Sequence, residues 1–207
     1  MRIFIALDID SEIRERIARY VQGVRNFAPD AKWVGAESFH ITLKFIGEMS
    51  AQDVERLKRE LRSVESSAFP VSFGGHGFFP NPRSARVFWV GIRADERLQE
   101  LAARVDAAAS TLGIAREEHG LKPHLTLARA RNESGSPHQR SRPGSSSGSG
   151  FERVQEKLQG LPEPEFGTMT ATEFFLYESK LSPKGAQYTK LERFALRTAP
   201  EEPAEGQ

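Results

Sequence analysis

The sequence predicts an α+β fold built as two similar lobes, each a mostly antiparallel sheet with outer helices. Two observations lead to this prediction. Apolar patterns with the periods of strands and helices alternate along the chain in the order β-α-β-β-α-β-β-α-β. A short phrase, histidine-apolar-threonine-leucine, also occurs twice, at His40–Leu43 and at His124–Leu127, and each copy lies in a predicted strand that comes after a predicted helix.

The first elements follow from alternation and capping. Arg2–Leu7 is an apolar run that predicts a strand. Asp10 or Ser11 can cap a helix that continues to about Arg25, because apolar residues recur along one side of it. Two short strands should follow, the second holding the first motif: Ala31–Val34 and Phe39–Gly47.

Two further helices have clear starting residues. Ser50 can cap the first, and Asp95 opens the second, which should end near Gly113. The first of these helices has its apolar residues at helical spacing: Val54, Leu57, Leu61 and Val64. The strands predicted between and after these helices, the last of which holds the second motif, are Pro70–Phe79, Arg86–Ile92 and Pro123–Ala130.

The composition changes sharply after the second motif. Asn132–Gly150 has no aliphatic or aromatic residue, so we expect a flexible low-complexity loop. Residues 199–207 are rich in Pro and Glu and should form a disordered tail, which leaves residues 1–198 as a single bilobal domain. The remaining predicted elements are a helix at Phe151–Leu158 and strands at Thr168–Glu178 and Tyr188–Leu196.

The overall composition excludes several classes of function. The 207 residues are 38% hydrophobic and 28% charged, which suits a globular protein with a core. The net charge of +1 does not suggest a protein that coats nucleic acid. No cysteine is present, which excludes thiolate catalysis and cysteine-ligated metals. Because we find neither a signal peptide nor a run of about 18 apolar residues, we expect a cytoplasmic protein without membrane contact, monomeric by default.

The two motifs suggest a chemistry. Alternate side chains of a strand share a face, so His40 lies beside Thr42, and His124 beside Thr126, while the intervening residues enter a core. Two imidazoles around one reacting group can supply a general base and a general acid near neutral pH. Threonine hydroxyls can bind phosphoryl oxygens. The pattern therefore predicts cleavage of a phosphodiester without a metal or other cofactor.

The motif histidines and the residues near them also have other interpretations. Paired histidines can bind a metal, but the motif strands contain no carboxylate and no typical ligand spacing. Lys44 should share the face of His40 and could steer a phosphate, although a solvated lysine is an equal alternative. Arg129 is a binding candidate only if its strand bulges or ends before it, because strict alternation puts it opposite His124. Aromatic residues that could stack a base are Trp33, Phe39, Phe45, Phe78 and Phe79.

At these residues the chain resembles the 2H phosphoesterase superfamily, and within it the bacterial and archaeal RNA 2′,3′-cyclic phosphodiesterases, once called 2′-5′ RNA ligases. The resemblance covers nearly the whole chain apart from Asn132–Gly150 and the tail. It is carried by both motifs and the segments RIFIALDI, SFHITLKFIGE, ARVFWVGI, KPHLTLAR and YESKLSPKGAQYTKLERFAL.

The resemblance implies two lobes around a central cleft and hydrolysis of an RNA-terminal 2′,3′-cyclic phosphate to a 2′-phosphate. It implies that His124 activates water and that His40 protonates the 3′ oxygen, with the roles exchangeable. Thr42 and Thr126 would hold the phosphate, and Arg129 matches an arginine common after the second motif. Three alternatives remain: 2′-5′ ligation by the reverse reaction, a nucleotide-binding module, and a phosphodiesterase for small cyclic nucleotides. Arg140 and Arg142 of the loop could touch RNA or be inert.

Overall fold

The computed structural model describes residues 1–130, 151–182 and 185–197. The predictions made for the loop Asn132–Gly150, with Arg140 and Arg142, and for the tail 199–207 lie outside the described residues. Four α-helices are seen in the described part: α1 (Ser11–Val24), α2 (Ala51–Leu61), α3 (Glu96–Ser110) and α4 (Glu152–Leu158). Three 3₁₀ turns accompany them: η1 (Arg25–Phe27), η2 (Ala36–Ser38) and η3 (Pro82–Ser84).

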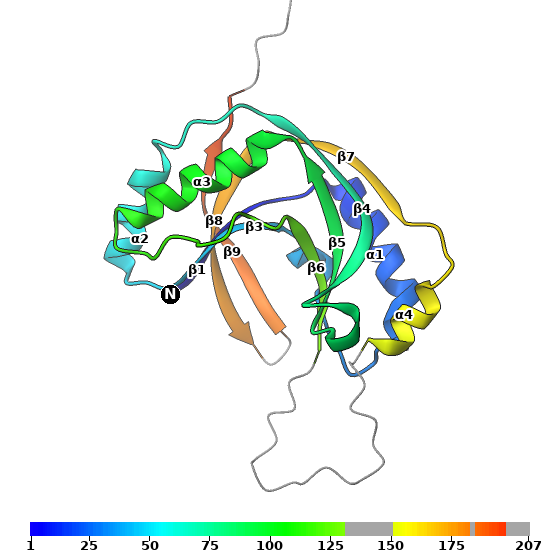
Figure 1. Ribbon diagram of the computed structural model, residues 1–207. Coiled ribbons are helices and arrows are strands. Elements are labelled where there is room, and N and C mark those ends of the chain that lie inside the picture. The colour runs from blue at the N-terminus through cyan, green and yellow to red at the C-terminus, as the bar shows by residue number, and fades with distance from the viewer. Residues whose placement is uncertain (131–150, 183–184, 198–207) are drawn as a thin grey trace, which may run out of the picture.

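Nine strands of the described chain form two sheets (Figure 1), and every pairing between them is antiparallel. The first sheet has the order β3 (Ile41–Glu48), β1 (Arg2–Leu7), β8 (Glu173–Ser182), β9 (Gly185–Ala195). The second has the order β2 (Lys32–Trp33), β6 (His124–Arg129), β5 (Val87–Ala94), β4 (Phe69–Phe79), β7 (Glu165–Ala171). The predicted α+β class with two antiparallel sheets is confirmed, and each sheet holds one motif strand.

The predicted helix starts are also confirmed. The Ser50 hydroxyl accepts a hydrogen bond from the Asp53 backbone N–H at 3.1 Å, so it caps α2. The Asp95 carboxylate accepts from the Arg97 N–H at 3.0 Å and caps α3. Helix α1 begins at Ser11 with Asp10 as its N-cap residue, one of the two expected, but the Asp10 side chain makes no capping hydrogen bond.

The predicted strand Thr168–Glu178 is wrong in one respect, because it is two strands. The chain leaves β7 of the five-stranded sheet at Ala171, passes Thr172, and enters β8 of the four-stranded sheet at Glu173. The run TMTATEFFLYE has strand-forming residues throughout, and no Gly or Pro marks the break. Only the tertiary pairing separates the two strands.

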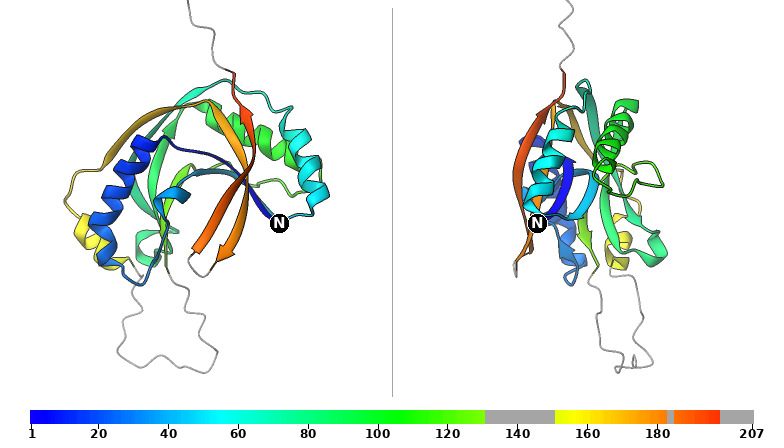
Figure 2. Two further views of the ribbon diagram at one scale, coloured as in Figure 1. Left: turned by 180° about the vertical axis from the view of Figure 1, so that it is seen from behind. Right: turned by 90° about the vertical axis from the view of Figure 1, so that its left-hand side faces the viewer.

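The two sheets share one interior. Helix α1 follows β1 in the chain yet packs against β7 of the other sheet, where Arg16 donates to the Phe166 carbonyl at 3.1 Å. Helix α3 follows β5 yet packs against β3. Figure 2 shows α1 and α4 along one flank and α2 and α3 along the other. Because buried residues from both sheets form one continuous cluster, the packing fixes the position of β3 relative to β6.

Candidate active site

The two motifs meet through a contact between the sheets. Strand β3 is the edge of the four-stranded sheet, β6 lies next to the edge of the five-stranded sheet, and residues of the two strands contact each other. His40 immediately precedes β3, and His124 is the first residue of β6. The apolar motif residues are buried, as expected: Ile41, Leu43, Leu125 and Leu127. The two histidines and two threonines are partly exposed.

Both imidazoles are held in the same way. His40 Nδ1 lies 2.7 Å from the carbonyl oxygen of Ser38, and His124 Nδ1 lies 2.7 Å from that of Lys122. A carbonyl oxygen can only accept, so Nδ1 carries the proton in each ring. In a neutral ring Nε2 therefore has the free lone pair, which is the arrangement that a general base requires.

Aromatic rings pack against both histidines. The His40 ring lies 4.9 Å from the Phe4 ring and 5.2 Å, edge to face, from that of Tyr188. The ring centroids of His124 and Phe79 lie 5.0 Å apart, with the two rings perpendicular. Sequence reasoning missed Phe4 and Tyr188, because β1 and β9 are far from either motif in the chain and only the sheet order reveals their position.

A β-bulge interrupts each motif strand at the same place. In β3 the pairing with β1 skips Leu43, and in β6 the pairing with β5 skips Leu127. A bulge moves the following residue to the other face of the strand. Arg129 therefore returns to the face of His124 and Thr126, and its side chain is exposed there. The bulge that the alternation argument required for Arg129 is present.

The bulge in β3 contradicts the prediction for Lys44. Beyond the bulge at Leu43, Lys44 turns toward the interior, and its side chain is only 2% exposed. Its ammonium group lies 2.6 Å from Asp106 Oδ1 of α3, so it is a buried ion-pair partner and does not lie beside Thr42. Phe45 takes the outer position instead; it is 58% exposed, and its ring lies 6.1 Å from that of Phe4.

Charges near the site act differently on the two rings. Burial lowers the pKa of His40 and of His124 below the ordinary 6.5, and the positive charge of Arg129 lowers both further. The hydrogen bonds from Nδ1 to the carbonyl groups oppose this shift of each pKa. The carboxylate of Asp8 also raises the pKa of His40, and the guanidinium of Arg14 lowers it; neither group acts on His124.

Asp8 is a site residue that sequence reasoning missed. Its carboxylate accepts from Arg14 Nη2 and from Lys190 Nζ, each at 2.5 Å, and from the Ile9 backbone at 2.9 Å. These partners and its neighbours hold its pKa below the usual value although burial opposes this, so Asp8 is an anion. The segment before His40 is fixed to the same group, because Arg14 also donates to the Ala36 carbonyl at 2.5 Å.

The five aromatic candidates for base stacking differ in exposure and packing. Phe39 and Phe78 are buried in the core, and Trp33 packs on Phe88 while its Nε1 donates to the Ala28 carbonyl at 2.9 Å. Phe79 lies against His124. Only Phe45 of the five has a largely exposed ring, on the side of the site that holds His40.

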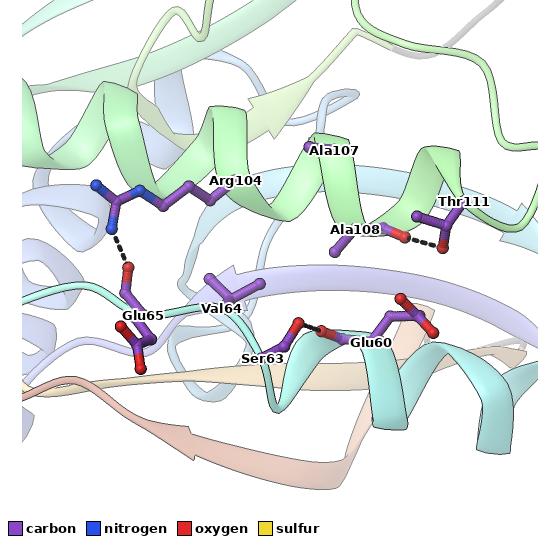
Figure 3. Close-up of a pocket in the computed structure, with 8 residues that line it drawn as sticks. All are labelled: Glu60, Ser63, Val64, Glu65, Arg104, Ala107, Ala108 and Thr111. Atoms are coloured by element: carbon purple, nitrogen blue, oxygen red, sulfur yellow. Dashed lines mark hydrogen bonds between the residues drawn. The ribbon is translucent and has the colours of Figure 1, made fainter.

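Two hollows lie elsewhere on the described surface. One of about 430 Å³ lies between α2 and α3 (Figure 3), where Arg104 donates to the Glu65 carbonyl and the hydroxyl groups of Ser63 and Thr111 donate to backbone carbonyls. Another of about 580 Å³ is lined by α4 and His76. His76 lies in β4, partly buried, with its ring 6.1 Å from that of Phe88. Neither hollow contains a motif residue.

No group of three or more His, Asp or Glu side chains in the described ranges is arranged to hold a metal ion. None of the helices described has the length and apolar character that crossing a membrane requires.

The fold is that of solved phosphoesterases. A crystal structure described as a phosphoesterase superposes with a TM-score of 0.73 at 28% identity, covering 95% of this chain and 98% of the other. The crystal structure of E. coli LigT complexed with 3′-AMP superposes with a TM-score of 0.72 at 28% identity, covering 94% and 97%.

Sequence comparison gives the family. Residues 7–89 match the description "LigT like Phosphoesterase". A protein of Archaeoglobus fulgidus named RNA 2′,3′-cyclic phosphodiesterase is 33% identical over 194 residues, 94% of this chain and 99% of the relative. An Escherichia coli protein of the same name is 29% identical over 94% of this chain and 96% of its own length. The chain belongs to the LigT-like phosphoesterase family.

Proposed function

We propose that this chain hydrolyses RNA-terminal 2′,3′-cyclic phosphates to 2′-phosphomonoesters, with His124 as general base and His40 as general acid and without a metal. One observation carries the proposal: two imidazoles, each with Nδ1 bonded to a carbonyl and Nε2 free, stand on contacting strands of two sheets. The relatives' name, RNA 2′,3′-cyclic phosphodiesterase, supports the same substrate.

The reaction balances with these two groups. His124 Nε2 takes a proton from water as the water oxygen forms a bond to phosphorus. The bond from phosphorus to the ribose 3′ oxygen breaks, and protonated His40 gives its Nε2 proton to that oxygen. The product is a 2′-phosphate and a free 3′ hydroxyl. His40 then regains a proton and His124 loses one, which restores the starting state.

The electrostatic asymmetry supports this assignment of roles. A general acid must hold a proton before the reaction, and the Asp8 carboxylate raises the pKa of His40, which favours its protonated form. No carboxylate acts on His124 in this way; burial is the largest influence on both rings and lowers the pKa of each. The phosphate of a bound substrate is itself an anion and favours the protonated imidazole further.

Three other side chains complete the proposed site. The hydroxyl groups of Thr42 and Thr126 lie on the histidine faces and can donate to the non-bridging oxygens of the phosphate. Arg129 adds a cation whose planar donors suit a phosphate. Lys44 is not among the proposed substrate-binding residues, because its ammonium group is already paired in the interior.

The direct test uses a short RNA that ends in a 2′,3′-cyclic phosphate, incubated with the protein in EDTA. We expect conversion to a 2′-phosphate end: mass and sensitivity to phosphatase identify a phosphomonoester, and chromatography against 2′- and 3′-phosphate standards distinguishes the two isomers. A 3′-phosphate product would reverse the proposed leaving group. Activity that requires an added divalent cation would overturn the metal-free mechanism. Binding of the RNA without turnover would favour the alternative that the chain is a nucleotide-binding module.

The pH dependence should identify the acid. Because kcat/KM reports the free enzyme and both histidine pKa values lie below 6.5, we expect a bell-shaped profile with its maximum below pH 6.5. Asp8→Asn removes the anion that raises the pKa of His40, so that pKa falls and the descending limb moves to lower pH. The ascending limb, set by His124, should stay in place. A shift of the ascending limb alone would exchange the roles.

Phe45 should contribute to binding rather than to chemistry. A ring that stacks on a base contributes about 1–3 kcal/mol, so Phe45→Ala should raise KM for a cyclic-phosphate oligonucleotide by about fivefold or more with little change in kcat. Phe27→Ala is the matched control, because Phe27 is a partly exposed ring on η1, on the face toward α4. Equal KM values for both variants would remove Phe45 from the site.

A further inference from the structure

Lys44 is a buried cation for which the proposed chemistry has no use. Its Nζ lies 2.6 Å from Asp106 Oδ1, 2.7 Å from the Ala115 carbonyl oxygen and 3.4 Å from Glu117 Oε1. An ammonium group has three protons, and here three acceptors surround it. A buried charge needs such partners, since an unpaired one is strongly unfavourable.

These acceptors belong to the segment that leads into the second motif. Residues 111–123 join α3 to β6 without a helix or strand. Lys44 holds this segment at Ala115, and Asp106 Oδ1 accepts from the Glu117 backbone at 3.2 Å. Farther along, Gln99 donates to the Leu121 carbonyl at 2.8 Å. The next carbonyl, that of Lys122, is the one that orients His124.

Lys44 therefore links the two motifs through the protein interior. It lies in β3, the strand that begins directly after His40, and the bulge at Leu43 directs it inward to the connection that ends at His124. We propose that Lys44, paired with Asp106, is a positioning residue that sets the place of the His124 imidazole relative to β3. This inference rests on the proposed two-histidine function, in which the two rings must stand at a fixed separation around one phosphate.

The chemistry of the site favours lysine over arginine. Lys44 bonds three acceptors around a single nitrogen, whereas a guanidinium group is planar and needs room for a fork. Lys44→Met keeps the length of the side chain and removes the charge, but it leaves the largely covered Asp106 carboxylate without its cation. Lys44→Met combined with Asp106→Leu removes both charges, a change that is often neutral or stabilising.

Kinetics and stability of these variants test the proposal. Misplacing a catalytic group by about 1 Å can lower the rate about a hundredfold, so we expect both variants to lose kcat by about tenfold to a hundredfold with little change in KM. The double variant should recover its melting temperature but not its kcat, because the Ala115 carbonyl still lacks a donor. Lys58→Met, which removes a lysine paired with Glu55 on α2, should leave kcat unchanged.

NMR of the two imidazoles separates this proposal from the proposed function. In the double variant the ring signals of His124 should shift while those of His40 keep their wild-type positions. If kcat returns together with stability, or if the His124 signals are unchanged, Lys44 has only a structural role. If the wild-type protein hydrolyses no cyclic phosphate, the proposed function fails, and the imidazole spectra still decide whether Lys44 positions His124.

Discussion

Replacing either His124 or His40 with alanine should lower kcat for a 2′,3′-cyclic phosphate by about a thousandfold, because each proton transfer contributes about 10²- to 10⁴-fold. Both rings are fixed by a bond from Nδ1 to a carbonyl, so the loss comes from Nε2, the only nitrogen left to act. Single-turnover rates with saturating enzyme are the appropriate measurement, since they exclude effects on product release. His119→Ala is the matched control, because His119 is exposed in the segment before β6.

A substrate with sulfur in place of the 3′ oxygen separates the two roles. A thiolate leaves without needing a proton, so the general acid becomes unnecessary while the water must still be activated. We expect His40→Ala to recover most of the wild-type rate on this substrate and His124→Ala to stay inactive. The opposite pattern would exchange the acid and the base, and no recovery in either variant would mean that neither ring protonates the leaving group.

The faces on which the motif residues lie could be predicted from the sequence. Strand alternation is a local property, and it correctly placed Ile41 and Leu125 in the core with His40 and His124 facing outward. What alternation cannot supply is the position of a bulge, because the extra residue is specified by the partner strand. That is why Lys44 was assigned to the wrong face and why the face of Arg129 stayed open.

Long-range pairing explains the other omissions. Asp8 directly follows β1 and acts on His40 only because β1 pairs with β3, and Tyr188 reaches the same ring from β9, at the far edge of that sheet. The division at Thr172 has the same cause, since one uninterrupted run of strand-forming residues pairs with two different sheets. Sheet order depends on contacts between distant segments, and no local pattern in this chain encodes it.

Arg129→Ala should lower kcat/KM by about tenfold to a hundredfold, since a hydrogen bond to a charged group contributes about 1.5–3 kcal/mol. Arg129→Lys should recover only part of this, because an ammonium group provides the charge without the two-pronged donor of guanidinium. Arg93→Ala is the matched control: Arg93 is an exposed arginine on β5 whose partner is Glu165 at 2.8 Å. A similar loss in that control would assign the effect to long-range attraction of RNA rather than to a contact with phosphate.

Arg129→Ala should also shift the pH profile of kcat/KM. This shift tests whether the guanidinium lies near the two imidazoles, independently of any contact with the substrate. The guanidinium of Arg129 lowers the pKa of both His40 and His124, so its removal raises both values. In Arg129→Ala, both limbs of the kcat/KM profile should shift to higher pH, whereas Asp8→Asn moves only the descending limb, and in the other direction. An Arg129 variant with lower activity and unmoved limbs would place the guanidinium near the substrate but away from the two rings. Opposite shifts in the two variants would show that one acid, His40, is tuned by an anion from its own sheet and a cation from the other.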